Sequence, residues 1–281
     1  MNKEELKALR INACKVRMGI IEGTYRAKSG HPGGSLSAAD VLTYLYFSEM
    51  DVKPEDPKWA DRDRFVLSKG HAAPALYSAL AFRGFFPPEE LKTLRQIGSR
   101  LQGHPNMNLT PGVDMSTGSL GQGVSTACGM ALGIKKSGGL QRVYALLGDG
   151  ELQEGQVWEA MMFAAHNKLD DLCVIVDNNG LQIDGPVDKV MSPYPIDEKL
   201  RAFGLFVQVV DGHDFEQLDA AFKEARLHKG VPSAIVMKTV KGKGVSYMEN
   251  QVGWHGKAPN DDEYRTAMQE LAMQLKELEA E

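Results

Sequence analysis

Two places in the sequence set polar side chains directly after an apolar run. Asp149 lies between two glycines after the run at 143–147, and the pair Asn178–Asn179 follows the run at 172–176. A helix-forming stretch at 154–168 separates them, so the segment predicts one βαβ unit. If its strands are neighbours in a parallel sheet, the carboxylate and the amides meet at the carboxyl ends of the strands, where open α/β sheets bind ligands.

The chemistry expected at that edge is metal binding. Carboxylate, amide and carbonyl oxygens suit Mg²⁺, which usually completes its coordination shell with phosphate oxygens and water. The glycines on either side of Asp149 allow backbone to approach a phosphate closely. Gly, Asp and Asn also dominate ordinary turns, and a turn explains GDG when it is taken alone. The two motifs at the two ends of one βαβ unit favour a metal that holds a diphosphate.

Five short apolar runs predict the strands of one sheet: 64–68, 143–147, 172–176, 206–210 and 233–239. Helical stretches alternate with them, at 119–137, 154–168 and 214–229. Continuous apolar strands separated by helices are typical of a parallel sheet that is covered on both faces. The expected fold class is therefore α/β, a doubly wound, mostly parallel sheet with helices on both faces.

Amphipathic stripes predict a helix at each end of the chain. The stripes are Leu6, Leu9, Ala13, Val16 and Ile20 near the N-terminus, and Tyr264, Met268, Leu271, Leu275 and Leu278 near the C-terminus. Ser37 is expected to cap the helix that follows it, and Asp214 to cap the helix after it. No linker or repeat divides the sequence, so residues 1–281 are expected to form a single domain. The stretch 98–118 is long for a connection, and such loops are often functional.

The bulk composition restricts partners and compartment. A net charge of −5 argues against nucleic acid or an anionic membrane as a partner, and no apolar run reaches membrane-spanning length. The N-terminus reads as a charged helix rather than a signal peptide. Cys14, Cys128 and Cys173 are far apart and suit reduced, packed thiols. A cytoplasmic protein is expected.

Four of the seven histidines follow a glycine: His31, His71, His104 and His213. Glycine–histidine loops hold a donor and acceptor ring on backbone that can turn sharply. Their separations fit no local zinc motif, and a single loop histidine is more often structural than catalytic. We assign His213 to a turn before the next helix and give it no role in the site.

The motifs, in their order, resemble those of the transketolase family of thiamine-diphosphate enzymes. The matching stretches are SGHPGG (29–34), SKGHAAPALYSAL (68–80), TGSLGQG (117–123), GDGELQEG (148–155), DNNG (177–180) and KTVKGKG…WHGK (238–257). The resemblance covers essentially the whole chain. It implies the diphosphate-binding domain of a transketolase, in which thiamine diphosphate is the cofactor and Mg²⁺, or another divalent cation such as Ca²⁺, is the metal.

The resemblance also implies roles for individual residues. It makes Asp149, the side chain of Asn179 and the backbone carbonyl of Leu181 the metal ligands. It implies that the cofactor contacts are His71, Gly118, Ser119, Leu120, Gly150, Asn179, Lys241 and His255. It implies that the catalytic histidines, which face substrate, are His31, His71, His104 and His255. Glu154 matches an acid near the subunit interface of the family.

Ordinary members of the family are more than twice as long, because pyrimidine-binding and C-terminal domains follow this one. The resemblance therefore implies a split transketolase whose partner chain carries those domains, in a heterotetramer of two plus two chains with cofactor between unlike chains. The implied reaction moves a two-carbon ketol unit from a ketose phosphate of the xylulose 5-phosphate type to an aldose phosphate, as in the pentose phosphate pathway.

Other functions stay open at this point. A different split thiamine-diphosphate enzyme is one, such as a deoxyxylulose-phosphate synthase, a 2-oxo-acid dehydrogenase component or a transketolase for an unusual sugar. A non-catalytic module that binds thiamine diphosphate is another, although binding alone does not require the four motif histidines. A Mg²⁺-dependent phosphohydrolase shares GDG and little else.

Overall fold

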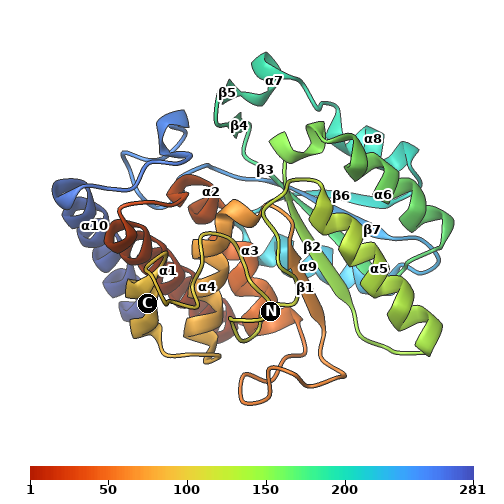
Figure 1. Ribbon diagram of the computed structural model, residues 1–281, viewed down its shortest axis with the longest axis horizontal. Coiled ribbons are helices and arrows are strands. Elements are labelled where there is room, and N and C mark those ends of the chain that lie inside the picture. Colours follow the sequence, from red (N-terminus) through yellow and green to blue (C-terminus); the bar gives the residue numbers. More distant parts are fainter.

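The computed structural model describes residues 1–281, and its centre is a five-stranded sheet (Figure 1). The strands are β1 (Arg64–Leu67), β2 (Val143–Gly148), β3 (Leu172–Asn178), β6 (Phe206–Asp211) and β7 (Ser233–Lys238). They lie in the order β1-β2-β3-β7-β6, and every neighbouring pair is parallel. The expected parallel α/β sheet is confirmed, and each predicted strand coincides with an observed one.

Helices cover both faces of the sheet. One face carries α1 (Lys3–Ala27), α3 (Ala39–Tyr44), α4 (Ala73–Arg83) and α9 (Phe215–Leu227), and the other carries α5 (Gln122–Ser137), α6 (Gly155–His166) and α8 (Ile196–Ala202). Successive side chains of a strand point to opposite faces. In β2, Tyr144 and Leu146 accordingly join the first core, whereas Ala145 and Leu147 join the second. Burial on both sides explains why the strands read as continuous apolar runs.

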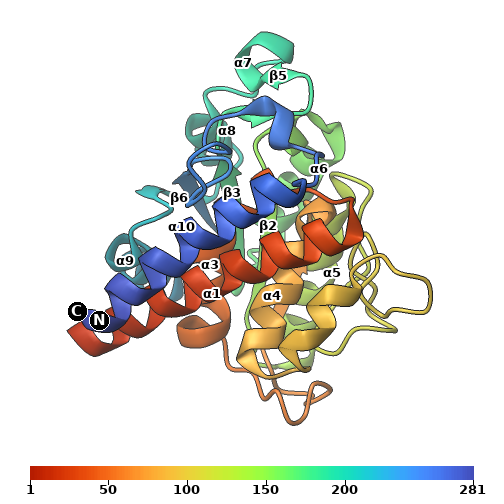
Figure 2. The same ribbon diagram turned by 90° about the vertical axis from the view of Figure 1, so that its left-hand side faces the viewer.

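The two terminal helices lie side by side on the outside of one layer (Figure 2). The last helix, α10 (Asp261–Ala280), buries Ala267 and Leu271 against α1, and the rest of its predicted stripe packs against the same core. Arg10 and Glu281 form an ion pair at 2.8 Å, which joins the two ends of the chain. Both predicted terminal helices are therefore confirmed, and they pack against each other.

The remaining elements are short and lie mostly at the carboxyl edge of the sheet. They are α2 (Pro32–Ser37), a π-helix (Leu45–Glu49), 3₁₀ turns (Gly70–Ala72, Pro88–Thr93, Gly150–Gln153 and Val252–Trp254), the hairpin β4 (Leu181–Gln182) and β5 (Gly185–Pro186), and α7 (Val187–Val190). The predicted loop 98–118 lies within an irregular stretch between residues 94 and 121.

The expected cap by Ser37 is wrong. The chain already enters a helix at Pro32, so Ser37 is the last residue of α2, and α3 begins with Ala38 as its N-cap. The Ser37 hydroxyl instead donates to Asp177 Oδ2 at 2.6 Å. The cap by Asp214 is confirmed, because its side chain accepts the backbone N–H groups of Glu216 and Gln217.

No helix of the structure combines the length and apolar character that a membrane span requires. The three cysteines are free thiols, and all of them are buried.

Candidate functional site

The turns after β2 and β3 are joined by Asp149. The two strands pair in parallel, with Gly148 opposite Asp177, so their turns leave the same edge of the sheet. Asp149 Oδ2 accepts the backbone N–H of Gly180 at 2.6 Å, and Oδ1 accepts that of Gly150 at 2.8 Å. The carboxylate and the asparagine turn therefore meet as the sequence predicts.

The oxygen atoms at this edge fit a divalent cation. Asp149 is only 2% exposed, and burial together with the charge of Asp177 raises its pKa to about 6. A bound cation would keep this carboxylate ionised. The other two expected ligands already have one partner each, since Asn179 Oδ1 accepts the Leu181 N–H at 3.1 Å and the Leu181 carbonyl accepts from Lys241 Nζ at 3.2 Å. An oxygen atom with two lone pairs retains one for a metal.

A set of one carboxylate, one amide and one carbonyl leaves most of an octahedral shell to other ligands. No group of three His, Cys, Asp or Glu side chains in the chain is placed to hold a metal ion. The donor set therefore suits Mg²⁺ that keeps phosphate and water ligands, rather than a closed site such as structural zinc.

A cavity of about 350 Å³ opens beside Asp149. Nine of the residues expected in the site line it: His71, Gly118, Leu120, Asp149, Gly150, Asn179, Leu181, Lys241 and His255. They come from five loops that are distant in sequence, and all of these loops lie at the carboxyl ends of strands or at the starts of helices. The parallel sheet explains this convergence, because every one of its strands ends at the same edge.

Three of the four motif histidines contact one another. The ring centroids of His71 and His255 are 5.2 Å apart, and His31 lies 5.4 Å from His71 and 5.6 Å from His255. Burial lowers the pKa of His31 to about 4, and the nearby charge of Arg95 acts in the same direction. Burial likewise lowers the pKa of His255 to about 3, and here the charge of Lys241 adds to the effect. Burial also places the pKa of His71 well below its usual value. The three imidazoles are therefore neutral near pH 7.

Three of the expected site residues, His31, His104 and Ser119, lie beside the cavity rather than in its lining. The ring of His104 packs on Gly118, where a β-carbon would come within 3.0 Å of the ring atoms. Ser119 is exposed, and its carbonyl accepts the N–H of Gln122 at 3.3 Å, at the start of α5. Their neighbours Gly118 and Leu120 line the cavity in their place.

Lys241 is buried with its ammonium group against the cavity. Lys241 is 2% exposed, and its Nζ lies 3.0 Å from His255 Nδ1 and 3.2 Å from the Leu181 carbonyl oxygen. Burial lowers the pKa of Lys241 to about 8, and the charge of Lys69 acts in the same direction. A buried ammonium group whose only partners are a carbonyl and an imidazole nitrogen is well suited to an anionic ligand.

The sequence patterns predict no role for Lys69 and Asp177, which form a buried ion pair at the cavity that Lys69 lines. Lys69 also donates to the Gly34 carbonyl at 2.8 Å, and Asp177 accepts from Ser37 and Thr239. A signal was present, because Lys69 directly follows the first apolar run and Asp177 directly follows the third. All strands of a parallel sheet end at one edge, so charged residues at the ends of the first and third runs can meet there.

Glu151 was also overlooked. It is 2% exposed, and it accepts from the Ser68 hydroxyl, from the Gly121 N–H at 2.9 Å and from the Gly148 N–H at 3.0 Å. Burial raises the pKa of this carboxyl group. One side chain thus joins three of the loops that line the cavity. The sequence shows only a glutamate two residues after Asp149, and nothing in its spacing indicates three partners.

Comparisons with known proteins give one consistent result. A family model described as "Transketolase, thiamine diphosphate binding domain" matches residues 8–279. The chain is 44% identical over 256 residues to a 6-deoxy-6-sulfo-D-fructose transketolase subunit of Clostridium sp. (strain MSTE9), covering 91% of this chain and 93% of that one. It is 40% identical over 277 residues to an apulose-4-phosphate transketolase subunit of Phocaeicola vulgatus, covering 99% and 98%.

Among solved structures, transketolase from Campylobacter jejuni superposes with a TM-score of 0.89 at 32% sequence identity. The match covers 99% of this chain but 46% of that one. The chain therefore spans nearly the full length of the two subunits and less than half of the complete enzyme.

Proposed function

The chain belongs to the transketolase family, and we propose that it is the diphosphate-binding subunit of a split transketolase. It corresponds to the thiamine-diphosphate-binding domain of the family over residues 8–279. Two relatives of nearly the same length are themselves named as transketolase subunits. These lengths support a single diphosphate-binding domain over residues 1–281, with the pyrimidine-binding and C-terminal domains on a partner chain. A heterotetramer of two plus two chains is the assembly we propose.

In this proposal Asp149, Asn179 and the Leu181 carbonyl hold Mg²⁺, and Lys241 contacts the diphosphate. Two observations support these roles. The four residues line one cavity, and the Asp149 carboxylate is buried with a raised pKa, which a bound cation would lower. Gly118, Leu120 and Gly150 offer backbone to the cofactor, with Ser119 at the rim. When bound, thiamine diphosphate supplies the nucleophilic carbon and the electron sink that ketol transfer needs.

The observation that carries the proposal is the contact of His31 with His71 and His255, which line the same cavity as the metal-ligand set. Cleaving a ketose between carbons 2 and 3 requires removal of the proton on the 3-hydroxyl group, and the reverse step returns it. Neutral imidazoles can accept this proton and hydrogen-bond the sugar hydroxyls. His31 Nδ1 is buried without a hydrogen-bond partner, as expected of a group that waits for a substrate hydroxyl. We place His104 at the edge of the same substrate site.

The substrate class follows from the family and its relatives. We propose transfer of a two-carbon ketol unit from a ketose phosphate to an aldose phosphate, with xylulose 5-phosphate as the general donor. A specialised sugar is a second candidate, because the two relatives of matching length are named for 6-deoxy-6-sulfo-D-fructose and apulose 4-phosphate. Free, buried thiols support a place in the reducing cytoplasm.

To test the proposal, the chain is tagged in its native host and purified together with the proteins bound to it. Ketol transfer to ribose 5-phosphate is assayed from xylulose 5-phosphate, 6-deoxy-6-sulfo-D-fructose and apulose 4-phosphate, with and without thiamine diphosphate and Mg²⁺. We expect transfer that depends on both additions and on a second chain of comparable size. The same complex carrying Asp149→Asn is the matched negative control.

Other outcomes would replace the proposal. Condensation of pyruvate with glyceraldehyde 3-phosphate would indicate a deoxyxylulose-phosphate synthase, and oxidative use of a 2-oxo acid would indicate a dehydrogenase component. Cofactor binding without turnover of any donor would indicate a binding module. Phosphate release without thiamine diphosphate would indicate a phosphohydrolase. Enzyme-like transfer by this chain alone would contradict the split site.

A further inference from the structure

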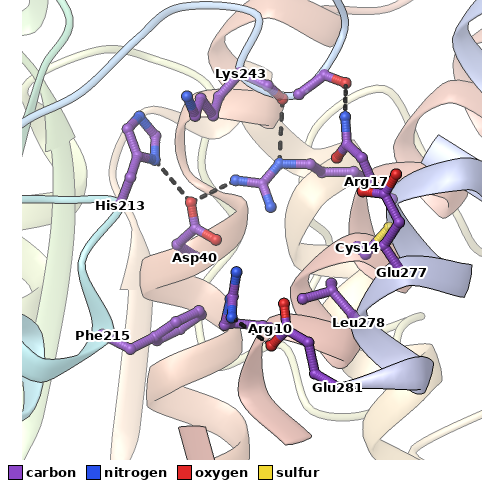
Figure 3. A pocket seen from close by; sticks show the side chains of 12 residues that line it. Arg10, Cys14, Arg17, Asp40, His213, Phe215, Lys243, Glu277, Leu278 and Glu281 are labelled. Carbon is purple, nitrogen blue, oxygen red and sulfur yellow. Dashed lines mark hydrogen bonds and ion pairs between the residues drawn. The ribbon is translucent and has the colours of Figure 1, made fainter. Parts of the chain in front are cut away.

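A second cluster of charged side chains lies outside the cavity, between α1, α3 and the turn that follows β6 (Figure 3). Its members are Arg17 on α1, Asp40 on α3 and His213 in the turn. Asp40 Oδ2 accepts from His213 Nδ1 at 2.7 Å and forms an ion pair with Arg17 Nη2. Asp40 is 4% exposed and Arg17 is 8% exposed, so solvent does not screen the pair effectively. We call these three residues the Arg17–Asp40–His213 network.

Both ends of this network hold the backbone of one loop, residues 240–244, which we call the lysine loop. His213 Nε2 accepts the N–H of Val240 at 2.8 Å, and Arg17 Nε donates to the Lys243 carbonyl at 3.1 Å. The contacts lie one residue before and two residues after Lys241. Figure 3 shows the Arg17 guanidinium between Asp40 and the Lys243 carbonyl. Lys241 lines the cavity, and the network holds the backbone of its loop at Val240 and Lys243.

The hydrogen bonds fix the form of the His213 ring. Because the Val240 N–H is a donor, Nε2 must present its lone pair, so the ring proton lies on Nδ1 and is donated to Asp40. Burial opposes ionisation of Asp40, but the Arg17 charge and the hydrogen bond from His213 hold its pKa below the usual value. An ionised Asp40 therefore orients the ring in the manner that a carboxylate orients a metal-bound histidine.

We propose that the Arg17–Asp40–His213 network is a positioning device that sets Lys241 for the diphosphate of the cofactor. The inference rests on the proposed function, because it takes Lys241 as a cofactor contact. The Lys241 ammonium reaches His255 and the Leu181 carbonyl at 3.0 and 3.2 Å. These distances are lost if the loop backbone moves by an ångström. A loop that is ordered before the ligand arrives also pays less ordering entropy when it binds.

Two substitutions at His213 separate the two hydrogen bonds. In His213→Gln the amide oxygen can take the place of Nε2 and accept from Val240, whereas in His213→Asn the amide nitrogen can take the place of Nδ1 and donate to Asp40. His166 lies exposed on α6 with no side-chain hydrogen bond, so His166→Asn is the matched control. Arg17→Met removes the bond to Lys243 and tests the other end of the network.

The first measurement is amide hydrogen exchange of the full chain. We expect His213→Asn to raise exchange of the lysine loop about tenfold without a similar change elsewhere, and His213→Gln to restore most of the protection. The second measurement uses the complex with the partner chain and titrates thiamine diphosphate in the presence of Mg²⁺. We expect its Kd to rise about five- to tenfold in His213→Asn and in Arg17→Met, with kcat at saturating cofactor within twofold of wild type. In His166→Asn neither quantity should change.

Several outcomes would overturn the proposal. A looser lysine loop with an unchanged Kd would reduce the network to a structural role. Equal effects of Gln and Asn at His213 would exclude the bond to Val240 as the cause, as would unchanged exchange in both. Global loss of protection in the His213 variants, combined with a normal Kd in Arg17→Met, would also overturn it. Wild-type complex that binds no thiamine diphosphate would instead refute the proposed function itself.

Discussion

Lys69 and Asp177 form a buried ion pair at the wall of the cavity, which Lys69 lines, with side-chain exposed fractions of 2% and 0%. Lys69 follows β1 and Asp177 belongs to β3, so the pair spans the end of β2, which carries Asp149. Ser37 and Thr239 donate to Asp177, and Gly34 accepts from Lys69. The pair thereby connects four segments that surround the site.

Replacing one member of this pair should be costly. Lys69→Met leaves Asp177 buried without its cation, and breaking a buried pair in this way costs about 3–5 kcal/mol. Urea unfolding of the full chain measures the loss. The double variant Lys69→Met/Asp177→Asn should recover part of it, because no unpaired charge remains. A single variant as stable as wild type would contradict the prediction.

The metal prediction concerns Asp149. Asp149→Asn keeps the shape of the side chain but removes the negative charge, so we expect thiamine diphosphate to bind at least tenfold more weakly in the presence of Mg²⁺. Calorimetric titration of the complex measures this change. Asp61 is exposed at the opposite edge of the sheet, and Asp61→Asn is the control that should bind normally. Equal binding by Asp149→Asn with and without Mg²⁺, at wild-type affinity, would exclude Asp149 as a ligand.

Most of the fold could be predicted from the sequence because its signals are local or periodic. The strand runs, the terminal stripes and the order of turns all depend on near neighbours, and a parallel sheet then requires Asp149 and Asn179 to share an edge. Ser37 was misjudged for the same reason. A serine before a helical stretch suggests a cap, but here the preceding residues were already helical and Asp177 was a better partner.

Hydrogen bonds between residues far apart in the chain could not be predicted from local sequence patterns. Glu151 accepts from residues 30 and 83 positions away in the chain, and His213 joins Asp40 to Val240 across 173 and 27 positions. Such contacts arise only when the sheet closes and brings loops together. The predicted turn at His213 is confirmed for its backbone. Its ring, however, has partners on two other elements.

Close backbone packing at Gly70 gives a third prediction. A β-carbon there would lie 2.6 Å from the Gly118 nitrogen and 2.9 Å from its Cα, so Gly70→Ala must separate two loops of the cavity. We expect a loss of about 1–3 kcal/mol in unfolding free energy and weaker cofactor binding. Gly129 in α5 has open space around it, and Gly129→Ala should stabilise the chain by up to about 1 kcal/mol. Denaturant unfolding of the pair checks both signs, and similar effects would refute the packing argument.

The last prediction concerns the pH dependence of stability at His255. Its folded pKa of about 3 lies below the ordinary value of 6.5, so the unfolded chain binds the proton more readily. The neutral His255 ring therefore contributes its full stabilisation of the fold at neutral pH. This stabilisation decreases as the pH drops below about 6.5 and continues to decrease toward the folded pKa.

Asp149 acts in the opposite sense, because its folded pKa of about 6 is raised and protonation favours the fold. Comparing wild type with His255→Asn cancels that effect. Between pH 7 and pH 5, wild type should lose on the order of 1 kcal/mol more than the variant, allowing for solvent screening of a partly exposed ring. Unfolding in urea at the two pH values, with His166→Asn as the control, measures the difference, and parallel pH profiles for wild type and His255→Asn would show that the ring is protonated equally in both states.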